Sequence, residues 1–85
     1  MSTEVILRNF ILENYLFTED QSELDNDDSF LDMGIIDSTG IMEVVWFIEE
    51  QFGLQVGDDE LMPENLDSIN NLVKFIAVKT AAKAS

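Results

Sequence analysis

The sequence contains no cysteine and no histidine among its 85 residues. Without cysteine there is neither a disulfide to brace a small core nor a thiolate for metal binding or catalysis. Without histidine, the chain lacks the side chain that most often serves as a general base near neutral pH and as a transition-metal ligand. Ser-His-Asp and Cys-His arrangements are therefore excluded, and we expect a protein that is not an enzyme.

Positive charge is nearly as scarce. Four basic residues stand against 18 acidic ones, which gives a net charge of −14. No lysine or arginine lies between Arg8 and Lys74, and this central stretch of 65 residues carries 17 of the acidic residues. Nucleic acid is a poor partner for such a surface, because binding it depends on neutralising phosphates with Lys and Arg. Basic protein surfaces, which the negative field attracts over long range, are the expected partners.

Long apolar runs are also absent. None approaches the roughly 18 residues that a membrane-spanning helix needs, and the polar residues 1–4 show no signal peptide. We therefore expect a cytoplasmic protein that does not insert into membranes. A chain of this length is expected to form one domain over residues 1–85, with frayed ends at 1–2 and roughly 80–85, and to be a monomer.

Apolar residues recur at helical spacing in several segments, and strand-like alternation is absent. Helices are predicted over 3–17, over 38–53 and from about 69 onward, with a short helical turn within 58–66. The acidic segment 18–29 has no periodicity and predicts a loop. Three apolar residues that follow it are expected to tuck under the core: Phe30, Leu31 and Met33. The prediction is an all-α fold, a small bundle of three long helices and one short one.

The predicted second helix has two apolar faces. At 100° per residue, one face is a core stripe made of Ile41, Val45, Ile48 and Phe52, with Val44 at its edge. Met42 and Trp46 lie roughly 100° or more from this stripe, among three glutamates. They either close the core against a neighbouring helix or form an exposed patch to which partners dock.

An Asp-Ser pair stands at the predicted start of the second helix. Phe30, Gly34 and Ser38 are spaced four residues apart, and Glu43 follows with apolar residues at helical spacing. This segment resembles the attachment site of acyl and peptidyl carrier proteins, and the order of the helices extends the resemblance over nearly the whole chain. An isolated Asp-Ser pair is more often only a helix cap. The spacing, the helix pattern and the missing catalytic residues together favour a carrier.

The resemblance implies that the Ser38 hydroxyl, flanked by Asp37, is esterified with 4′-phosphopantetheine, whose terminal thiol carries the cargo as a thioester. An anionic phosphodiester would be favoured at a helix N-terminus by the unpaired amides and the helix dipole. The implied partners are a phosphopantetheinyl transferase, an adenylate-forming ligase or acyltransferase, and downstream acyl-using enzymes. In the family the corresponding helix is the main recognition surface. The partner-binding residues expected here are Thr39, Met42, Glu43, Trp46, Glu49 and Glu50.

The residues around Ser38 also bear on the pathway. The segment Gly34–Gly40 differs from the Gly-Ala-Asp-Ser-Leu-Asp that is usual in fatty acid carriers. Its Asp-Ser-x-Gly form is more similar to discrete carriers charged by adenylate-forming ligases, including the D-alanyl carrier of teichoic acid modification. The segment Met62–Ile69, however, lacks the Trp-Asp associated with D-alanyl carriers. We expect a stand-alone carrier domain for an acyl or aminoacyl cargo in a specialised lipid or secondary-metabolite pathway. A D-alanyl carrier and a small acidic interaction domain are the alternatives.

A calcium-binding module is a further alternative to weigh. Asp25, Asp27 and Ser29 have the i, i+2, i+4 spacing of an EF-hand loop. The sixth position would be Phe30 instead of Gly, and the twelfth would be Ile36 instead of Glu. The sharp turn and the closing ligand are both missing, so we expect no metal site.

Overall fold

The computed structural model describes residues 2–84, and within that range every regular element is helical. Three helices are long: α1 (Thr3–Ile11), α2 (Ser38–Phe52) and α4 (Ile69–Ala84). The shorter elements are η1 (Leu12–Leu16), η2 (Gln21–Glu23), η3 (Asp58–Glu60) and α3 (Pro63–Leu66). The prediction of an all-α fold with three long helices and one short one is confirmed.

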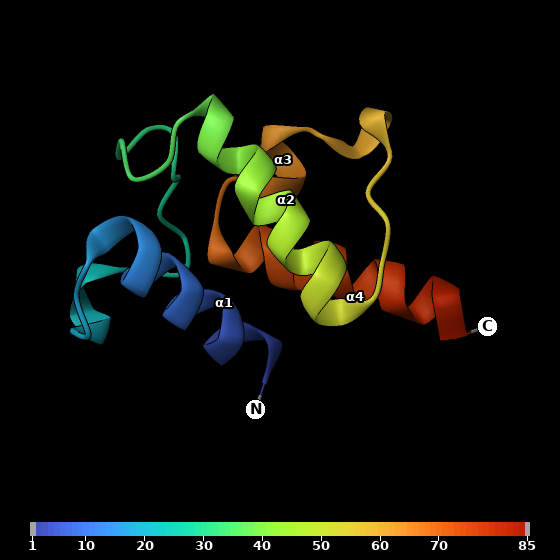
Figure 1. Cartoon of the computed structure of the whole chain (residues 1–85), viewed down its shortest axis with the longest axis horizontal. Helices are drawn as coiled ribbons and strands as arrows, with labels where there is room; N and C mark the ends of the chain where they lie inside the picture. Colours follow the sequence, from blue (N-terminus) through green and yellow to red (C-terminus); the bar gives the residue numbers. More distant parts are fainter. Residues whose placement is uncertain (1, 85) are drawn as a thin grey trace.

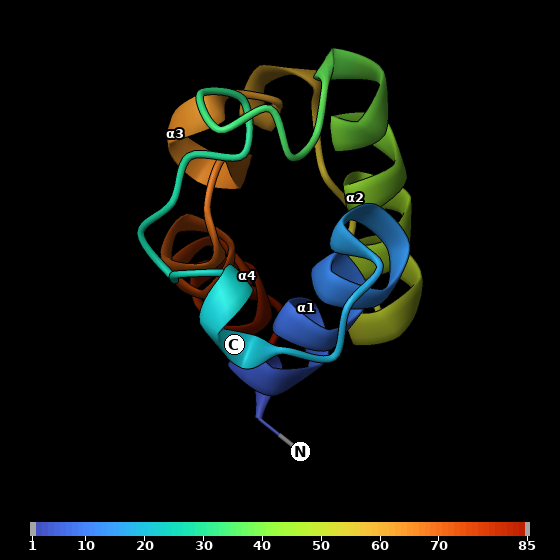
Figure 2. The same ribbon diagram turned by 90° about the vertical axis from the view of Figure 1, so that its left-hand side faces the viewer.

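Helix α4 packs against α1, α2 and α3 (Figure 1). The long connection from η1 to α2 runs past α3 before it reaches the first turn of α2, as the view in Figure 2 shows. The start of α2 therefore lies close to α3, although 24 residues of sequence separate Ser38 from Pro63. No helix within residues 2–84 is both long enough and apolar enough to span a membrane.

Local sequence sets the helix boundaries. Ser2, Asp37 and Ser68 each accept a backbone hydrogen bond through a side-chain oxygen at the start of α1, α2 and α4. Gly53 ends α2 in the left-handed conformation, with φ 66°. Pro63 occupies the first turn of α3, where its missing N–H costs no helical hydrogen bond. The predicted fraying at 1–2 and 80–85 stays a prediction, since α4 continues to Ala84 and residues 1 and 85 lie outside the described range.

The predicted first helix is correct in extent but not uniform. It is α-helical to Ile11 and then continues as the π-helical turn η1, which ends at Phe17 in a left-handed conformation with φ 53°. This wider turn displaces the side chains that follow Ile11 from the α-helical register. It brings Tyr15 over the first turn of α2, where its ring lies against Gly40.

The core is built from the apolar faces of the three long helices, together with residues of the loops. Its most deeply buried side chains are Phe30, Leu7, Ile11, Leu12, Leu24, Ile48, Leu66, Ile69, Leu72 and Val44. The stripe on α2 is rotated from the predicted one. Val44, placed at the edge, is fully buried, whereas Ile41 and Phe52 are only half-buried.

The prediction that three residues tuck under the core is right only for Phe30. Phe30 is fully buried, but Leu31 and Met33 are 40% and 61% exposed. The chain turns sharply here, with Met33 N–H donating to the Ser29 carbonyl at 2.9 Å. A turn that sends one side chain inward sends its neighbours outward, so the other two cannot follow Phe30.

Asp67 fastens this turn to the junction between α3 and α4. Its carboxylate accepts hydrogen bonds from the Leu31 amide at 2.9 Å and from the Ser29 hydroxyl, and its carbonyl accepts from the Phe30 amide at 2.8 Å. The Asp27 carboxylate likewise accepts from the side chain of Asn70. Two of the three residues with EF-hand spacing are thus used in contacts with α4 and with Asp67, the C-cap of α3. In the described part of the chain, no acidic side chains are grouped so as to hold a metal ion.

Candidate functional site

Ser38 is the first residue of α2 and is exposed. Asp37 precedes it as the N-cap, and one carboxylate oxygen accepts a hydrogen bond from the Gly40 amide at 2.7 Å. Within the described residues the Ser38 hydroxyl has no hydrogen-bond partner. The amides of Ser38 and Thr39 lie in the first turn, where no intrahelical carbonyl can accept from them. This end of α2 offers an accessible hydroxyl beside unpaired N–H groups.

The chain contains two other Asp-Ser pairs, and the structure separates them from Asp37-Ser38. Ser68 is only 6% exposed and caps α4 by accepting from the Asn71 amide at 3.1 Å. Ser29 is half-buried and donates its hydroxyl hydrogen to Asp67. Of the three hydroxyls, that of Ser38 alone is both exposed and without a hydrogen bond to another described residue.

Gly40 has a more specific role than a first turn that merely tolerates glycine. It is buried, and a Cβ at this position would lie 2.6 Å from Cγ2 of Ile36 and 3.4 Å from Cε1 of Tyr15. Ile36 is itself buried and β-branched, so it has little freedom to move away. The absence of a side chain at Gly40 lets α2 start tightly against the preceding loop and against η1.

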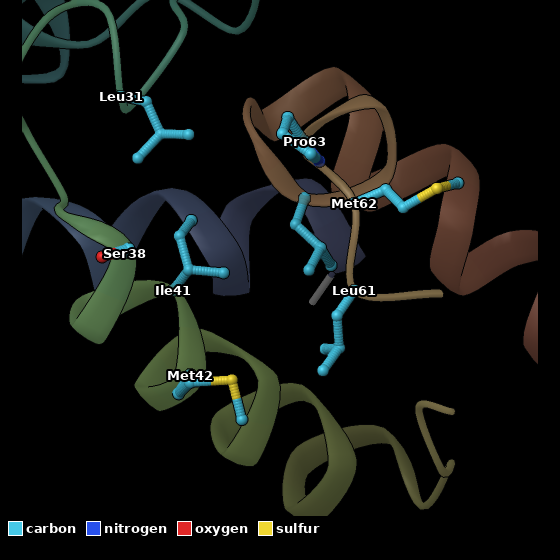
Figure 3. Close-up of a pocket in the computed structure, with 8 residues that line it drawn as sticks. Leu31, Ser38, Ile41, Met42, Leu61, Met62 and Pro63 are labelled. Carbon is cyan, nitrogen blue, oxygen red and sulfur yellow. The ribbon is translucent and has the colours of Figure 1, made fainter. Parts of the chain in front are cut away.

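An apolar cavity of about 210 Å³ lies beside Ser38. It is lined by Leu31, Ser38, Ile41, Met42, Leu61, Met62, Pro63 and Leu66. Figure 3 shows the side chains from α2 facing those from the segment before α3 across this space. Ser38 contributes the one hydroxyl of the lining, and every other lining side chain is apolar.

The far wall of this cavity was not predicted from the sequence. Leu61 and Met62 are apolar residues just before Pro63 that belong to no helical stripe. Apolar residues without a place in the core were the one sign in the sequence that this segment lines a cavity. Likewise, Leu31 was expected in the core, and the structure places it at the cavity instead.

The six residues expected to bind partners all lie on α2, and we refer to them together as the docking face: Thr39, Met42, Glu43, Trp46, Glu49 and Glu50. The exposed fractions of Met42 and Trp46 are 37% and 60%. The structure therefore favours an exposed patch over the alternative that Met42 and Trp46 close the core. Phe47, on another side of α2, stacks on Phe10 with ring centroids 3.9 Å apart.

The three glutamates of the docking face differ in their surroundings. Glu43 accepts a hydrogen bond from the Tyr15 hydroxyl at 2.8 Å, and Glu49 accepts one from the Val56 amide at 3.0 Å. Glu50 is exposed and has no side-chain hydrogen bond within residues 2–84. Two of the three carboxylates are thus held in place by contacts that the sequence did not reveal.

Tyr15 is half-buried against the first turn of α2. Its hydroxyl is 2.8 Å from Oε2 of Glu43 and 3.3 Å from the carbonyl oxygen of Gly40. Burial, followed by the hydrogen bond to Glu43 and the negative charges of Glu43 and Asp37, raises the pKa of Tyr15 to about 12. Tyr15 follows Phe10 and Ile11 at helical spacing, so the available signal was a hydroxyl on an apolar helix face, where a polar group has to find a partner.

Comparisons with known proteins agree with this geometry. The family described as "Phosphopantetheine attachment site" matches residues 16–76. The chain is 36% identical over 61 residues to an acyl carrier protein of Acidothermus cellulolyticus. This match covers 72% of this chain and 70% of that protein. It is 33% identical over 76 residues to a D-alanyl carrier protein of Streptococcus suis, and this match covers 89% of this chain and 92% of that protein. It is 34% identical over 61 residues to a D-alanyl carrier protein of Streptococcus uberis, and this match covers 72% of this chain and 76% of that protein.

The chain belongs to the phosphopantetheine attachment family. It is a carrier protein, and its prosthetic group is covalently attached 4′-phosphopantetheine. The residues present fit such a group, because an exposed serine hydroxyl stands at a helix N-terminus next to an apolar cavity.

Proposed function

We propose that Ser38 is the attachment residue and that the chain is a carrier domain whose cargo is an acyl group. The observation that carries the proposal is the apolar cavity of about 210 Å³ beside Ser38. When bound, 4′-phosphopantetheine supplies a terminal thiol to which the cargo is joined as a thioester.

The cavity favours an alkyl chain over an aminoacyl group. Its lining offers no carboxylate, although the chain as a whole has 18 acidic residues. An alkyl chain that enters gains about 0.8 kcal/mol for each methylene removed from water. An ammonium group that enters loses its hydration without gaining an ionic partner, at a cost of several kcal/mol. The acyl form is thus the one that the protein itself stabilises.

Attachment requires a partner enzyme. The oxygen of the Ser38 hydroxyl forms a phosphodiester with the phosphopantetheine part of coenzyme A, and adenosine 3′,5′-bisphosphate leaves. The hydroxyl proton must pass to a group of the transferase, since the Asp37 carboxylate is turned to the Gly40 amide and the chain has no histidine.

The docking face supports binding by the transferase and by the enzymes that load and use the cargo. Trp46 and Met42 offer exposed apolar surface, with Glu43, Glu49 and Glu50 around it. Exposed carboxylates attract a basic partner surface and mainly raise the association rate, while a central aromatic slows dissociation. A phosphopantetheinyl transferase, a ligase or acyltransferase and downstream acyl-using enzymes are the proposed partners, in a specialised lipid or secondary-metabolite pathway.

A D-alanyl carrier is the second candidate. The D-alanyl carrier protein of Streptococcus suis covers 89% of this chain, whereas the acyl carrier protein of Acidothermus cellulolyticus covers 72%. The missing Trp-Asp after Met62 and the apolar cavity weigh against this candidate. The family match favours either kind of carrier over a small acidic interaction domain.

Thermal melts of differently loaded forms separate the two candidates. A phosphopantetheinyl transferase is used to load the apo protein from coenzyme A, octanoyl-coenzyme A or D-alanyl-coenzyme A. Burial of about two methylenes stabilises the octanoyl form by about 1.5 kcal/mol over the unacylated form, which raises Tm by roughly 6–12 °C. The D-alanyl form should have the same Tm as the unacylated form.

The matched control places a carboxylate in the cavity wall. Met62 is 39% exposed, so Met62→Asp should fold, and its octanoyl form should lose most of the added stability. Equal melting temperatures for the octanoyl and unacylated wild-type forms would refute the acyl assignment. A D-alanyl form more stable than the octanoyl form would favour the second candidate.

A further inference from the structure

Glu43 is the carboxylate of the docking face that a side chain from another element holds. Its partner is the Tyr15 hydroxyl, 2.8 Å from Oε2 and supplied by η1. We infer that Tyr15 is a positioning residue for partner docking, whose hydroxyl fixes the Glu43 carboxylate in the orientation in which a basic partner surface meets it. The inference rests on the proposed function, because it takes α2 as the surface that the transferase binds.

Tyr15 is suited to this role because its own position is fixed. Its ring packs edge-on against Phe10, with centroids 5.9 Å apart and an interplanar angle of 72°, and Phe10 stacks on Phe47 of α2. The ring also lies over Gly40, where the missing side chain leaves room for it. The hydroxyl reaches the Gly40 carbonyl oxygen as well, at 3.3 Å. A donor fixed on two sides in this way can order a flexible glutamate.

The hydrogen bond leaves Glu43 able to bind a partner. A carboxylate has about four acceptor positions, and Tyr15 uses one of them, so a lysine or arginine of the partner can still be received. A tyrosine is neutral and can donate at physiological pH even with its ordinary pKa of about 10, and the rise of the Tyr15 pKa to about 12 extends that range upward. The Glu43 carboxylate can therefore still accept from a partner while it loses side-chain freedom that binding would otherwise have to remove.

Glu50 provides the matched comparison on the same helix. It is exposed and has no side-chain hydrogen bond within the described residues, so Tyr15 has no direct contact through which to order it. If Tyr15 acts through Glu43, removing its hydroxyl should couple to a change at Glu43 and not to one at Glu50.

The test is a double-mutant cycle on loading of the apo protein by a phosphopantetheinyl transferase with coenzyme A. Tyr15→Phe should raise KM about threefold at unchanged kcat, since one side chain must then be ordered on binding. Glu43→Gln should raise KM as well, and adding Tyr15→Phe to it should have little further effect. In the Glu50→Gln background, Tyr15→Phe should raise KM by the same factor as it does in the wild type. A general structural role for Tyr15 would not produce this difference between the two backgrounds.

The contact itself can be followed without the transferase. The chain has a single tyrosine, so ultraviolet titration of tyrosinate reports Tyr15 alone. Glu43→Gln should lower its pKa from about 12 only part of the way toward 10, because burial, the largest cause of the rise, remains, and Glu50→Gln should leave it unchanged.

Three results overturn the inference: an unchanged tyrosine pKa in Glu43→Gln, an unchanged KM in Tyr15→Phe, or an equal effect of Tyr15→Phe with and without Glu43. A wild-type protein that the transferase never modifies refutes the proposed function, and the inference falls with it. Normal loading of wild type combined with any of the three results refutes the inference alone.

Discussion

Gly40→Ala sets two opposing effects against each other at the first turn of α2. In a helix, alanine is preferred to glycine by up to about 1 kcal/mol, and by less in the first turn. By propensity alone, the substitution should stabilise the protein. The new Cβ, however, would lie 2.6 Å from Cγ2 of Ile36, where a normal contact needs well over 3 Å.

Steric repulsion should win at this position. Ile36 is buried and stiff at χ1, and the ring of Tyr15 closes the other side of Gly40. Forcing an extra methyl group into a packed site costs about 1–3 kcal/mol. After the gain in propensity, we expect a net loss of about 1–2 kcal/mol, equivalent to a fall in Tm of roughly 4–16 °C for a domain of this size.

Urea unfolding followed by circular dichroism measures this loss, and a second variant identifies its cause. Leucine at position 36 keeps the volume but has no Cγ2, so Ile36→Leu should cost less than about 1.5 kcal/mol by itself. In the Ile36→Leu background, Gly40→Ala should become nearly neutral or stabilising. If Gly40→Ala stabilises the wild-type protein, or if its cost is the same in both backgrounds, the contact between residues 36 and 40 does not explain the glycine.

Three further predictions follow from the same structure. Trp46→Ala should weaken docking and raise the KM for loading, while the loss of unfolding free energy in a urea melt stays well under the ~3–5 kcal/mol expected for a buried aromatic. A large stability loss with unchanged loading would show that Trp46 contributes to the core and not to docking. The free energy of unfolding should fall between pH 10 and pH 12, because the unfolded chain releases the tyrosine proton near 10.0 and the folded one near 12; below pH 10 both states keep it, and Tyr15→Phe should remove this part of the fall. The far-UV circular dichroism spectrum should be helical in the presence of a chelator, since Asp27 and Ser29 already bond to Asn70 and Asp67; folding that appears only with micromolar calcium would contradict this.

The sequence predicted those parts of the fold that depend on local rules. Asp37 caps α2, Gly53 ends it and Pro63 starts α3, and each of these follows from the backbone preferences of a single residue. Helical angles placed Trp46 off the core stripe but left open whether it packs against a neighbouring helix, and the structure shows that it is exposed.

The parts that depend on packing between distant segments could not be predicted. A π-helical turn after Ile11 changes which side chains face α2, and no periodicity rule anticipates it. The contact between Tyr15 and Glu43 joins residues 28 positions apart, and the bond between Ser29 and Asp67 joins residues 38 apart. The cavity beside Ser38 has the same origin, because its two walls come from α2 and from the segment before α3.

Intact mass spectrometry after incubation with coenzyme A and a phosphopantetheinyl transferase tests the assignment of Ser38 most directly. The two other Asp-Ser pairs of the chain provide the controls, since Ser29 and Ser68 have the same neighbour but a bonded or buried hydroxyl. Wild type, Ser29→Ala and Ser68→Ala should each gain one phosphopantetheine, and Ser38→Ala should gain none. A modified Ser38→Ala, or a folded wild type that is never modified, would refute Ser38 as the attachment residue.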